Sequence, residues 1–396
     1  MTAAAPLLVA GGGIGGLAAA LAATRAGWPV QVFEQAAQFS EVGAGVQSGP
    51  NVVRLLQRWG LGDALARVAA FPRSLRVRGA HSGRELGTLH LQDFAQRYGA
   101  PYATIHRADL HRLLLDALRA DGAAQLHLEQ MLTAFAQDAE SVTVTVADGR
   151  QHQGAALVGA DGLRSRVREW LLNDGPPRAT GHLAYRALVA QHSLPEALRS
   201  QDVTVWLGPR LHVVQYPVQA GEWLNVVVLV EDPASLLLDN WDHSANPADV
   251  RHAVAGACAP LQYLLDAVPE WRRWALCNRP PVAGSQQVAR GRVALLGDAA
   301  HPMLPYLAQG AGMAIEDAAA LQQVLKGADA QQVPEALQAY AQARWQRNAR
   351  VQARSIRNGV IFHAIGPMRW GRDAAMRVLG RRVLDLPWLY QAQGPG

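Results

Sequence analysis

The chain has 396 residues, of which 49% are hydrophobic, and a formal net charge of +5 at pH 7. This length and composition predict a large globular protein with two interleaved domains. They exclude a membrane-spanning protein, because no apolar stretch reaches the roughly 18 residues that a membrane helix needs. No export signal is visible and only Cys258 and Cys277 are present, so we expect a cytoplasmic location without a disulfide framework or metal site.

Basic residues dominate the C-terminal part of the chain, where ten arginines face one acid, Asp373, between Arg344 and Arg382. Such a run forms either a solvated helix face with contacts to the rest of the fold, or a region that attracts anionic small molecules. Nucleic-acid binding is not expected, because no zinc finger, basic zipper or aromatic-interleaved basic stripe accompanies the charge.

A glycine-rich turn opens the chain, in "PLLVAGGGIGGLAAALAATRAGWPVQVFEQ". The apolar run at 6–10 predicts a strand, and an alanine-rich helix is expected to run to about Arg25. Between them Gly11, Gly13 and Gly16 fill the pattern G-x-G-x-x-G, which permits a tight turn, close approach of a pyrophosphate and close helix–strand packing. Glu34 ends the next strand, where a carboxylate can accept ribose hydroxyls. The stretch therefore predicts dinucleotide binding, without distinguishing FAD from NAD.

A second buried strand lies far downstream, in "GRVALLGDAAHPMLPYLAQGAGMAIEDAAAL". Parallel strands present their C-terminal ends to one crevice, so we expect Asp298 to reach the cofactor held at Gly13 and to accept a hydrogen bond from a ribityl hydroxyl. A helix beginning near Gln309 would stabilise the negative charge of a reduced flavin. Three small residues leave room for the flavin ring: Gly310, Ala311 and Gly312. This arrangement favours FAD.

Three stretches occur in a distinctive order: "GGGIGG", "LVGADGLRSRVR" and "GRVALLGDAAHPMLPYLAQGAGMAIEDA". Together they resemble the single-component FAD-dependent aromatic hydroxylases, the family of para-hydroxybenzoate and salicylate hydroxylases. The resemblance extends along most of the chain. It implies an α/β fold, with a Rossmann-like FAD-binding domain, an inserted antiparallel β-sheet substrate domain and C-terminal helices, as in para-hydroxybenzoate hydroxylase.

The resemblance also implies particular cofactor contacts. Asp161 belongs to a motif that serves both flavin and nicotinamide, and Arg107 matches a position that contacts FAD. The implied cofactor residues are Gly13, Ile14, Gly15, Glu34, Gln35, Gly45, Val46, Arg107, Leu132, Asp161, Asp298, Pro305, Gly310, Ala311, Gly312 and Met313. The nearest branches of the family imply NADH as the reductant, with NADPH as the alternative.

Short β-rich runs separated by Gly and Pro occupy residues 181–230 and predict an antiparallel sheet, to which 73–101 are expected to add strands. The expected FAD-binding domain comprises 1–72, 102–179 and 280–345, and the expected substrate domain comprises 73–101 and 180–279. The helical segment 346–396 would either cap the flavin domain or form a homodimer contact.

Within "LHVVQYPV", alternation places His212, Val214 and Tyr216 on one face of a strand. A phenol is more easily hydroxylated as phenolate, and a histidine that titrates near neutrality can take its proton. The pattern His-x-x-x-Tyr resembles the 3-hydroxybenzoate 6-hydroxylases, in which the histidine assists deprotonation and the tyrosine helps to hold the substrate. The resemblance therefore implies catalytic roles for His212 and Tyr216.

Three further residues are expected at the substrate. Gln47 lies in a glycine-flanked loop that the family places beside the flavin ring, although a plain turn residue is the alternative. Arg186 belongs to a Tyr-Arg pair usual in the family, and either faces an anionic substrate or makes a structural pair. Pro305 stands where the 3-hydroxybenzoate 6-hydroxylases carry a glutamine.

These observations predict an FAD-dependent monooxygenase that hydroxylates a phenolic aromatic acid, such as 3-hydroxybenzoate or salicylate, with NAD(P)H and dioxygen through a flavin C4a-hydroperoxide. The loop "HPMLP" looks closer to 6-hydroxynicotinate 3-monooxygenase, so a heteroaromatic acid is an alternative substrate. A flavoprotein of the same fold that acts on a non-phenolic substrate is a rival hypothesis. A protein that binds FAD without turnover is the rival from outside the enzymes.

Overall fold

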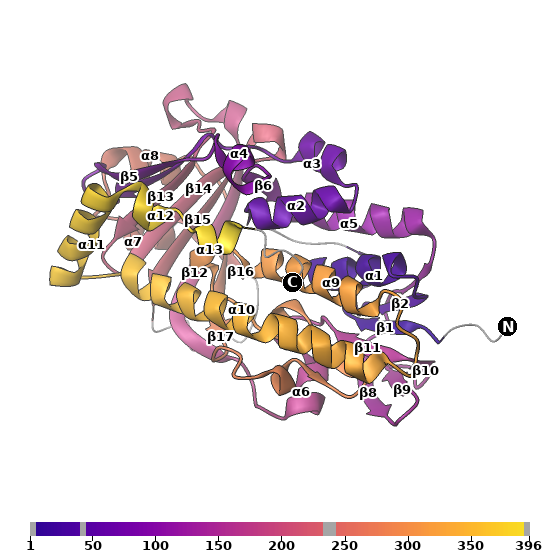
Figure 1. Cartoon of the computed structure of the whole chain (residues 1–396). Coiled ribbons are helices and arrows are strands. Elements are labelled where there is room, and N and C mark those ends of the chain that lie inside the picture. Colours follow the sequence, from indigo (N-terminus) through magenta and orange to yellow (C-terminus); the bar gives the residue numbers. More distant parts are fainter. Residues whose placement is uncertain (1–4, 40–44, 233–242, 392–396) are drawn as a thin grey trace. The chain divides into compact units, whose positions relative to one another are not determined.

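The computed structural model describes residues 5–39, 45–232 and 243–391 (Figure 1). By their contacts, these residues form two compact units. Unit 1 contains the described residues of Met1–Val42, Leu110–Arg178 and Asn278–Ser355, and unit 2 those of Gly43–Asp109, Ala179–Cys277 and Ile356–Gly396.

Unit 1 is built on a six-stranded sheet in the order β18-β19-β11-β1-β2-β7. Its members are β1 (Leu7–Ala10), β2 (Val30–Phe33), β7 (Ala124–His127), β11 (Ala156–Gly159), β18 (Ala289–Arg290) and β19 (Val293–Leu295). All pairings are parallel except that of β18 with β19. The central strands are continuous apolar runs such as Leu7–Ala10, which is typical of strands covered on both faces.

Helices cover one face of this sheet. Helix α1 (Ile14–Arg25) packs against β1, β2 and α9 (Gly310–Leu325). The other face carries a second, antiparallel sheet of β8 (Leu132–Gln137), β9 (Val142–Val146) and β10 (Gln151–Gly154), together with α6 (Arg166–Leu172). The expected strand 6–10, the helix to Arg25 and the helix near Gln309 are confirmed to within a residue.

Unit 2 is built on an eight-stranded sheet in the order β16-β17-β12-β15-β14-β13-β4-β5. Its members are β4 (Ser74–Gly79), β5 (Glu85–His90), β12 (Arg178–Ala190), β13 (Val203–Gly208), β14 (Leu211–Val218), β15 (Trp223–Glu231), β16 (His243–Ala245) and β17 (Trp271–Asn278). The expected contribution of 73–101 is confirmed, because β4 and β5 join this sheet. The pairing of β4 with β13 is parallel, so the sheet is not antiparallel throughout.

The two faces of this sheet differ in what covers them. One face packs against α7 (Pro247–Ala253) and α8 (Ala259–Asp266) in an apolar core that includes Val213, Val226 and Val228. The opposite face is covered at one end by Phe362, at the end of α10 (Val333–Phe362), and by Met376 of α11 (Gly366–Leu379). The remaining elements of unit 2 are β3 (Gly45–Ser48), β6 (Ala103–His106), α2 (Pro50–Arg58), α3 (Gly62–Val68), α4 (Phe94–Tyr98), α12 (Arg381–Leu384) and α13 (Pro387–Tyr390).

The compact units differ from the expected domain ranges at three boundaries. Residues 45–72 and 102–109 group with the large sheet, because β3 pairs with β6 and Thr104 Oγ1 donates to the Pro217 carbonyl of β14. The boundary expected at residue 346 falls inside the continuous helix α10. Helix α5 (Arg107–Asp121) likewise crosses a unit boundary. The assignment of the units to cofactor and substrate stays a prediction.

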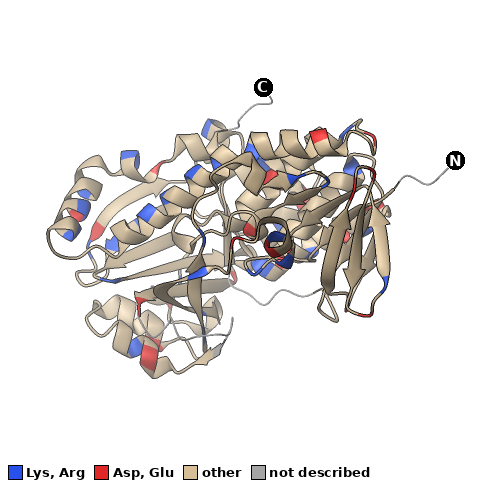
Figure 2. Ribbon diagram, turned by 90° about the horizontal axis from the view of Figure 1, so that it is seen from below, with Lys and Arg blue, Asp and Glu red and all other residues tan. Residues whose placement is uncertain are grey.

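The arginine-rich C-terminal part is partly internal. Arg344 and Arg347 of α10 are buried against Glu316 and Asp317 of α9, and Arg372 of α11 donates to the carbonyls of Ile361 and Phe362. Figure 2 shows Lys and Arg spread over many elements with Asp and Glu between them. Among the described residues, no helix is both long and apolar enough to cross a membrane.

Candidate functional site

The C-terminal ends of four neighbouring strands in unit 1 bring the predicted cofactor residues to one sheet edge. β19, β11, β1 and β2 are parallel neighbours in this order. Asp298 follows β19, Asp161 follows β11, Gly11 and its successors follow β1, and Glu34 follows β2. The sheet order therefore agrees with the expectation that Glu34, Gly13 and Asp298 share one edge. Ligands of open α/β sheets bind at such an edge.

The turn after β1 is shaped by glycines in a way that larger residues cannot reproduce. Gly11 has φ +100°, a backbone conformation that residues with a side chain rarely adopt. A Cβ on Gly16 would lie 1.8 Å from the carbonyl oxygen of Gly11, so the helix and the turn are in contact. Gly13 begins α1 in an extended conformation without a side-chain cap, which leaves the first amides of the helix available to a phosphate.

Glu34 organises this turn. Its Oε2 accepts a hydrogen bond from the Gly12 amide at 2.7 Å, and its Oε1 accepts one from Ala36 at 2.8 Å. The Gly12 carbonyl contacts Nε2 of His111 at 2.7 Å, so the middle of the turn is bound on both sides. A carboxylate has lone pairs for further donors, and these contacts are compatible with the predicted ribose hydrogen bonds.

The loop that carries Asp298 is held by a buried charged cluster that the sequence patterns did not reveal. Asp317 of α9 is fully buried, and its carboxylate bonds to Nε2 of His301 at 2.5 Å, Nε of Arg344 at 2.7 Å and the Gly297 amide at 3.2 Å. The contact with His301 and the cation of Arg344 lower the pKa of Asp317 despite its burial, which acts in the opposite direction. Asp298 itself is exposed, in the short turn Gly297–Ala299.

We name this group the Asp317 cluster. It consists of His301, Glu316, Asp317, Arg344, Arg347 and Asn348. Two carboxylates and two guanidinium groups balance one another in it, and each lies within hydrogen-bond distance of an opposite charge. The cluster fixes the start of the turn that presents Asp298.

The segment that contains Asp161 supports the loop that carries Asp298. Asp161 caps α6, where its carboxylate accepts hydrogen bonds from Ser165 Oγ at 2.5 Å and from the Arg166 amide at 2.8 Å. Burial raises the pKa of Asp161, and these hydrogen bonds oppose that shift. On α6, Arg168 donates to the carbonyls of Ala299 and Ala300, directly after Asp298. The structure thus gives Asp161 and Arg168 structural roles, while a flavin or nicotinamide contact of Asp161 stays a prediction.

The residues of unit 1 fit a flavin dinucleotide. α1 and α9 both begin without a side-chain cap and without acidic residues in the first turn. A Cβ on Gly310 would lie 3.9 Å from Oδ1 of Asp298, so the start of α9 adjoins the exposed carboxylate. The remaining predicted contacts in this unit are Ile14 and Gly15 in α1, Gln35 after β2, Leu132 at the start of β8, Pro305 in a short turn, and Ala311, Gly312 and Met313 in α9. The Leu132 side chain lies in the core, so only its backbone would be available to a ligand.

Three of the predicted substrate residues, Arg186, His212 and Tyr216, lie on one face of the large sheet of unit 2. β14 spans Leu211–Val218, as the pattern in the sequence predicts. The register pairs Val214 with Val227, and Val227 in turn with Arg186, so Arg186 lies in the row between those of His212 and Tyr216. The register thus puts Arg186 on the same sheet face as His212 and Tyr216, while its contact with a substrate stays a prediction. Arg186, Val214 and Val227 are half-buried, and the guanidinium carbon of Arg186 stands 4.8 Å from the ring centre of Trp274.

Tyr216 is bound to strand β3. Its hydroxyl donates to the Gly45 carbonyl at 2.6 Å, and burial raises its pKa above the ordinary value. The Gly45 amide donates to Oδ1 of Asn225, which lies opposite Tyr216 in the register. Among the described residues, Asn225 Nδ2 has no hydrogen-bond partner although Asn225 is fully buried. Asn225 is thus a polar residue of this face that the sequence patterns missed.

Gln47 lies on a strand and not in the loop that we expected. Residues Gly45–Ser48 pair with Ala103–His106, because the two segments present complementary backbone groups. Val46 and Gln47 are half-buried, and Oε1 of Gln47 accepts a hydrogen bond from the Tyr102 hydroxyl at 2.8 Å. Arg107 begins α5 directly after β6 and is also half-buried.

His212 has a partner that its own stretch of sequence could not reveal. It is 2% exposed, and its Nδ1 lies 2.8 Å from Nε2 of His363, a residue 151 positions away. Burial, followed by the neighbouring His363, lowers the pKa of His212 well below its ordinary value. The imidazole is therefore neutral at physiological pH and can accept a proton, but its cation is strongly disfavoured.

Comparisons with known proteins agree with this geometry. A family model described as "FAD binding domain" matches residues 4–355. The chain belongs to this FAD-binding family. It is 39% identical over 391 residues to a 3-hydroxybenzoate 6-hydroxylase of Polaromonas naphthalenivorans (strain CJ2), covering 97% of this chain and 95% of that protein.

Two further relatives bear on the substrate and the cofactor. A 6-hydroxynicotinate 3-monooxygenase of Bordetella bronchiseptica (strain ATCC BAA-588 / NCTC 13252 / RB50) is 37% identical over 348 residues, covering 87% of this chain and 89% of that protein. The crystal structure of Klebsiella pneumoniae HpxO complexed with FAD and uric acid is 28% identical with a TM-score of 0.84, over 96% of this chain and 94% of that one. The predicted fold and the predicted class, an FAD-dependent aromatic hydroxylase, are confirmed.

Proposed function

We propose that this flavoprotein hydroxylates a phenolic aromatic acid, similar to 3-hydroxybenzoate or salicylate, with NAD(P)H and dioxygen. The observation that carries the proposal is the face of the unit 2 sheet on which Arg186 lies between the rows of His212 and Tyr216. A half-buried cation, a buried neutral imidazole and a buried phenol on one face match the carboxylate and hydroxyl of such an acid. The similarity to a 3-hydroxybenzoate 6-hydroxylase supports the same substrate class.

Unit 1 would hold the cofactor. The glycine turn and the first amides of α1 would bind the pyrophosphate, Glu34 the ribose, and Asp298 the ribityl chain. Bound FAD, once reduced by NAD(P)H, would supply the activation of dioxygen. The first amides of α9 would stabilise negative charge on the reduced ring, because the helix dipole is positive at that end.

In the proposed reaction, the chain's own residues bind, orient and deprotonate the substrate. Arg186 would bind its carboxylate, and stacking on Trp274 restricts the guanidinium to this face. Burial lowers the pKa of His212 and so keeps the imidazole in the neutral form that can accept the phenol proton. The apolar side chains of Val214 and Val227 would exclude water from the reacting edge.

A heteroaromatic acid is the second candidate substrate. The loop that holds Pro305 resembles that of 6-hydroxynicotinate 3-monooxygenases, one of which is a relative of this chain. Its backbone is supported by Ser355, which donates to the Leu304 carbonyl, and by Gln352, which donates to the Pro302 carbonyl. A proline at this point offers no side-chain hydrogen bond, so a ring nitrogen or hydroxyl would have to be recognised by different groups.

Three finer points belong to the same proposal. NADH is the expected reductant, and a cytoplasmic location stays the expectation. Exposed apolar side chains on α11, among them Met368, Trp370 and Val378, support the expected homodimer contact. Sedimentation of the purified protein would decide between monomer and dimer.

The test of the proposed function uses the purified holoprotein. NADH oxidation is measured with a panel of hydroxybenzoates, salicylate and 6-hydroxynicotinate, and the products are identified. We expect a phenolic acid to accelerate NADH oxidation and to gain one oxygen atom. Arg186→Met should raise KM for that acid by about tenfold, while Arg84→Met, which changes an arginine of a surface turn, should leave KM unchanged. No acceleration by any acid of the panel would contradict the proposal.

A further inference from the structure

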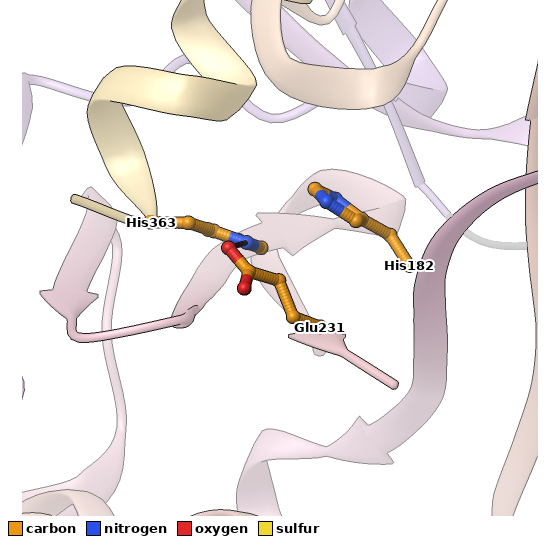
Figure 3. A group of neighbouring side chains, drawn as sticks. All are labelled: His182, Glu231 and His363. Carbon is orange, nitrogen blue, oxygen red and sulfur yellow. Dashed lines mark ion pairs between the residues drawn. The ribbon is translucent and has the colours of Figure 1, made fainter. Parts of the chain in front are cut away.

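Four ionisable side chains, one of them His212, meet at the end of the unit 2 sheet. His363 follows the last residue of α10, and its Nε2 lies 2.8 Å from Nδ1 of His212. On its other side, Nδ1 of His363 lies 3.6 Å from Oε1 of Glu231, at the end of β15. His182 of β12 stacks on the His363 ring (Figure 3). His212, His363 and Glu231 thus form a series from a buried imidazole to a carboxylate that is 37% exposed, with His182 beside it.

This group has the composition of a metal site but not its geometry. The ligand atoms of His182, Glu231 and His363 lie within 4.8 Å of one another. However, the rings of His182 and His363 are stacked, with centres 4.9 Å apart and planes inclined by only 17°. The lone pairs of two stacked imidazoles lie in two separate, nearly parallel planes, so they cannot both point at one ion. Proton transfer along the series fits this arrangement better.

The surroundings of the histidine pair exclude a stable imidazolium. Burial, and then the neighbouring His182 and Arg372, lower the pKa of His363 to about 3. In the part of the chain that the structure describes, four titratable or charged groups face the pair. They are Arg372 from α11, Glu231 from β15, His182 from β12 and Arg210 from the turn between β13 and β14. Arg372 is itself bonded to Asp373. A proton that arrives on His212 therefore has to leave it.

We propose that His363 is a positioning residue that passes the proton taken up by His212 to Glu231 and the solvent. This inference rests on the proposed function. The O–H bond of the substrate breaks and an Nε2–H bond forms on His212, while the proton on its Nδ1 moves to Nε2 of His363. The proton on Nδ1 of His363 moves to the Glu231 carboxylate and then to water. Both histidines end neutral, in the opposite tautomer, so no buried charge persists.

The backbone around His363 holds the ring in place for this transfer. The Arg210 amide donates to the His363 carbonyl at 3.1 Å, and Arg372 donates to the carbonyls just before it. The ring of Phe362 packs edge-on against His212 at 5.3 Å. The gap of 3.6 Å between His363 and Glu231 exceeds a hydrogen bond, but the side chain of Glu231 is partly exposed and can close it by a small rotation.

The experiment compares His363→Gln with His182→Gln as the matched control. Glutamine at 363 can accept the hydrogen bond of His212 but cannot exchange tautomers. We expect His363→Gln to slow hydroxylation by at least about tenfold at neutral pH, and to recover as the pH rises, because hydroxide then removes the proton. Absorbance of the bound substrate should show less phenolate in the variant at neutral pH. His182→Gln should keep the wild-type rate and pH profile.

A second variant and a thermal melting curve distinguish a folding defect from a loss of proton transfer. Glu231→Gln, at the partly exposed end of the series, should show a smaller loss with the same recovery at high pH. Wild-type rates in His363→Gln, or a loss that is equal at every pH, would overturn the relay alone. If the wild-type protein hydroxylates no phenolic acid, the proposed function fails and the relay with it.

Discussion

The Asp317 cluster in unit 1 and the histidine pair in unit 2 are both buried and polar, yet they treat charge in opposite ways. In the Asp317 cluster, two carboxylates pair with two arginines, and each group has an opposite charge within hydrogen-bond distance. Beside the histidine pair, the carboxylate of Glu231 stands 3.6 Å from His363, and the pKa values of both histidines are lowered. Full pairing favours a rigid support, whereas a neutral buried pair can still exchange a proton.

The largest expected effect tests the supporting role of the Asp317 cluster. Asp317→Asn removes one charge and leaves Arg344 buried without this partner. We expect the free energy of unfolding to fall by about 3 kcal/mol, the usual result of breaking a buried ion pair. Urea unfolding followed by tryptophan fluorescence measures it. Asp148→Asn is the control, because the exposed pair with Arg150 should contribute nothing measurable. Equal midpoints for Asp317→Asn and wild type would contradict the structural role.

The next effect tests the chemical role of the histidine pair. His212→Ala should slow hydroxylation by about 100-fold, since a general base typically contributes that much. A larger share of NADH should then appear as hydrogen peroxide. His90→Ala, which changes an exposed histidine on β5, is the control and should behave like wild type. Unchanged product per NADH in His212→Ala would count against the base.

The histidine pair and the Asp317 cluster should lose their contributions to the free energy of unfolding in different pH ranges. Burial lowers the pKa of His363 from its ordinary value of 6.5 to about 3 in the folded state, so the unfolded state binds more protons between these values. Stability should therefore be full above about pH 6.5 and fall as the pH drops toward 3, by at most about 1.4 kcal/mol per pH unit for each histidine. The Asp317 carboxylate adds its loss only at lower pH, below its ordinary pKa of 3.8. In His363→Gln, the free energy of unfolding should fall less steeply between about pH 6.5 and pH 3 than in the wild type. An unchanged slope would argue against a buried neutral pair.

The smallest effect concerns Tyr216. Tyr216→Phe removes the hydrogen bond to the Gly45 carbonyl and should lower the free energy of unfolding by about 1 kcal/mol. Because the hydroxyl proton is already donated to Gly45, we expect a smaller loss of activity than in His212→Ala. A loss as large as that of His212→Ala would show that the phenol takes part in the chemistry.

Local patterns predicted much of the fold. The glycine turn at Gly11–Gly16, the strand at Leu211–Val218 and the helix after Gln309 were readable because they depend on steric limits and side-chain periodicity within a few residues. The unit boundaries were not, because β3 and β6 joined unit 2 through pairings between distant segments.

The sequence by itself determined the class of this protein and which of its residues are candidates for the site. Only the tertiary structure decided their partners: His363 beside His212, the Asp317 cluster behind Asp298, and the Tyr216 hydroxyl on Gly45. The physical reason is burial. A side chain's pKa and its hydrogen-bond partner depend on groups that packing brings within a few ångströms, and no periodicity along the chain encodes which groups these are.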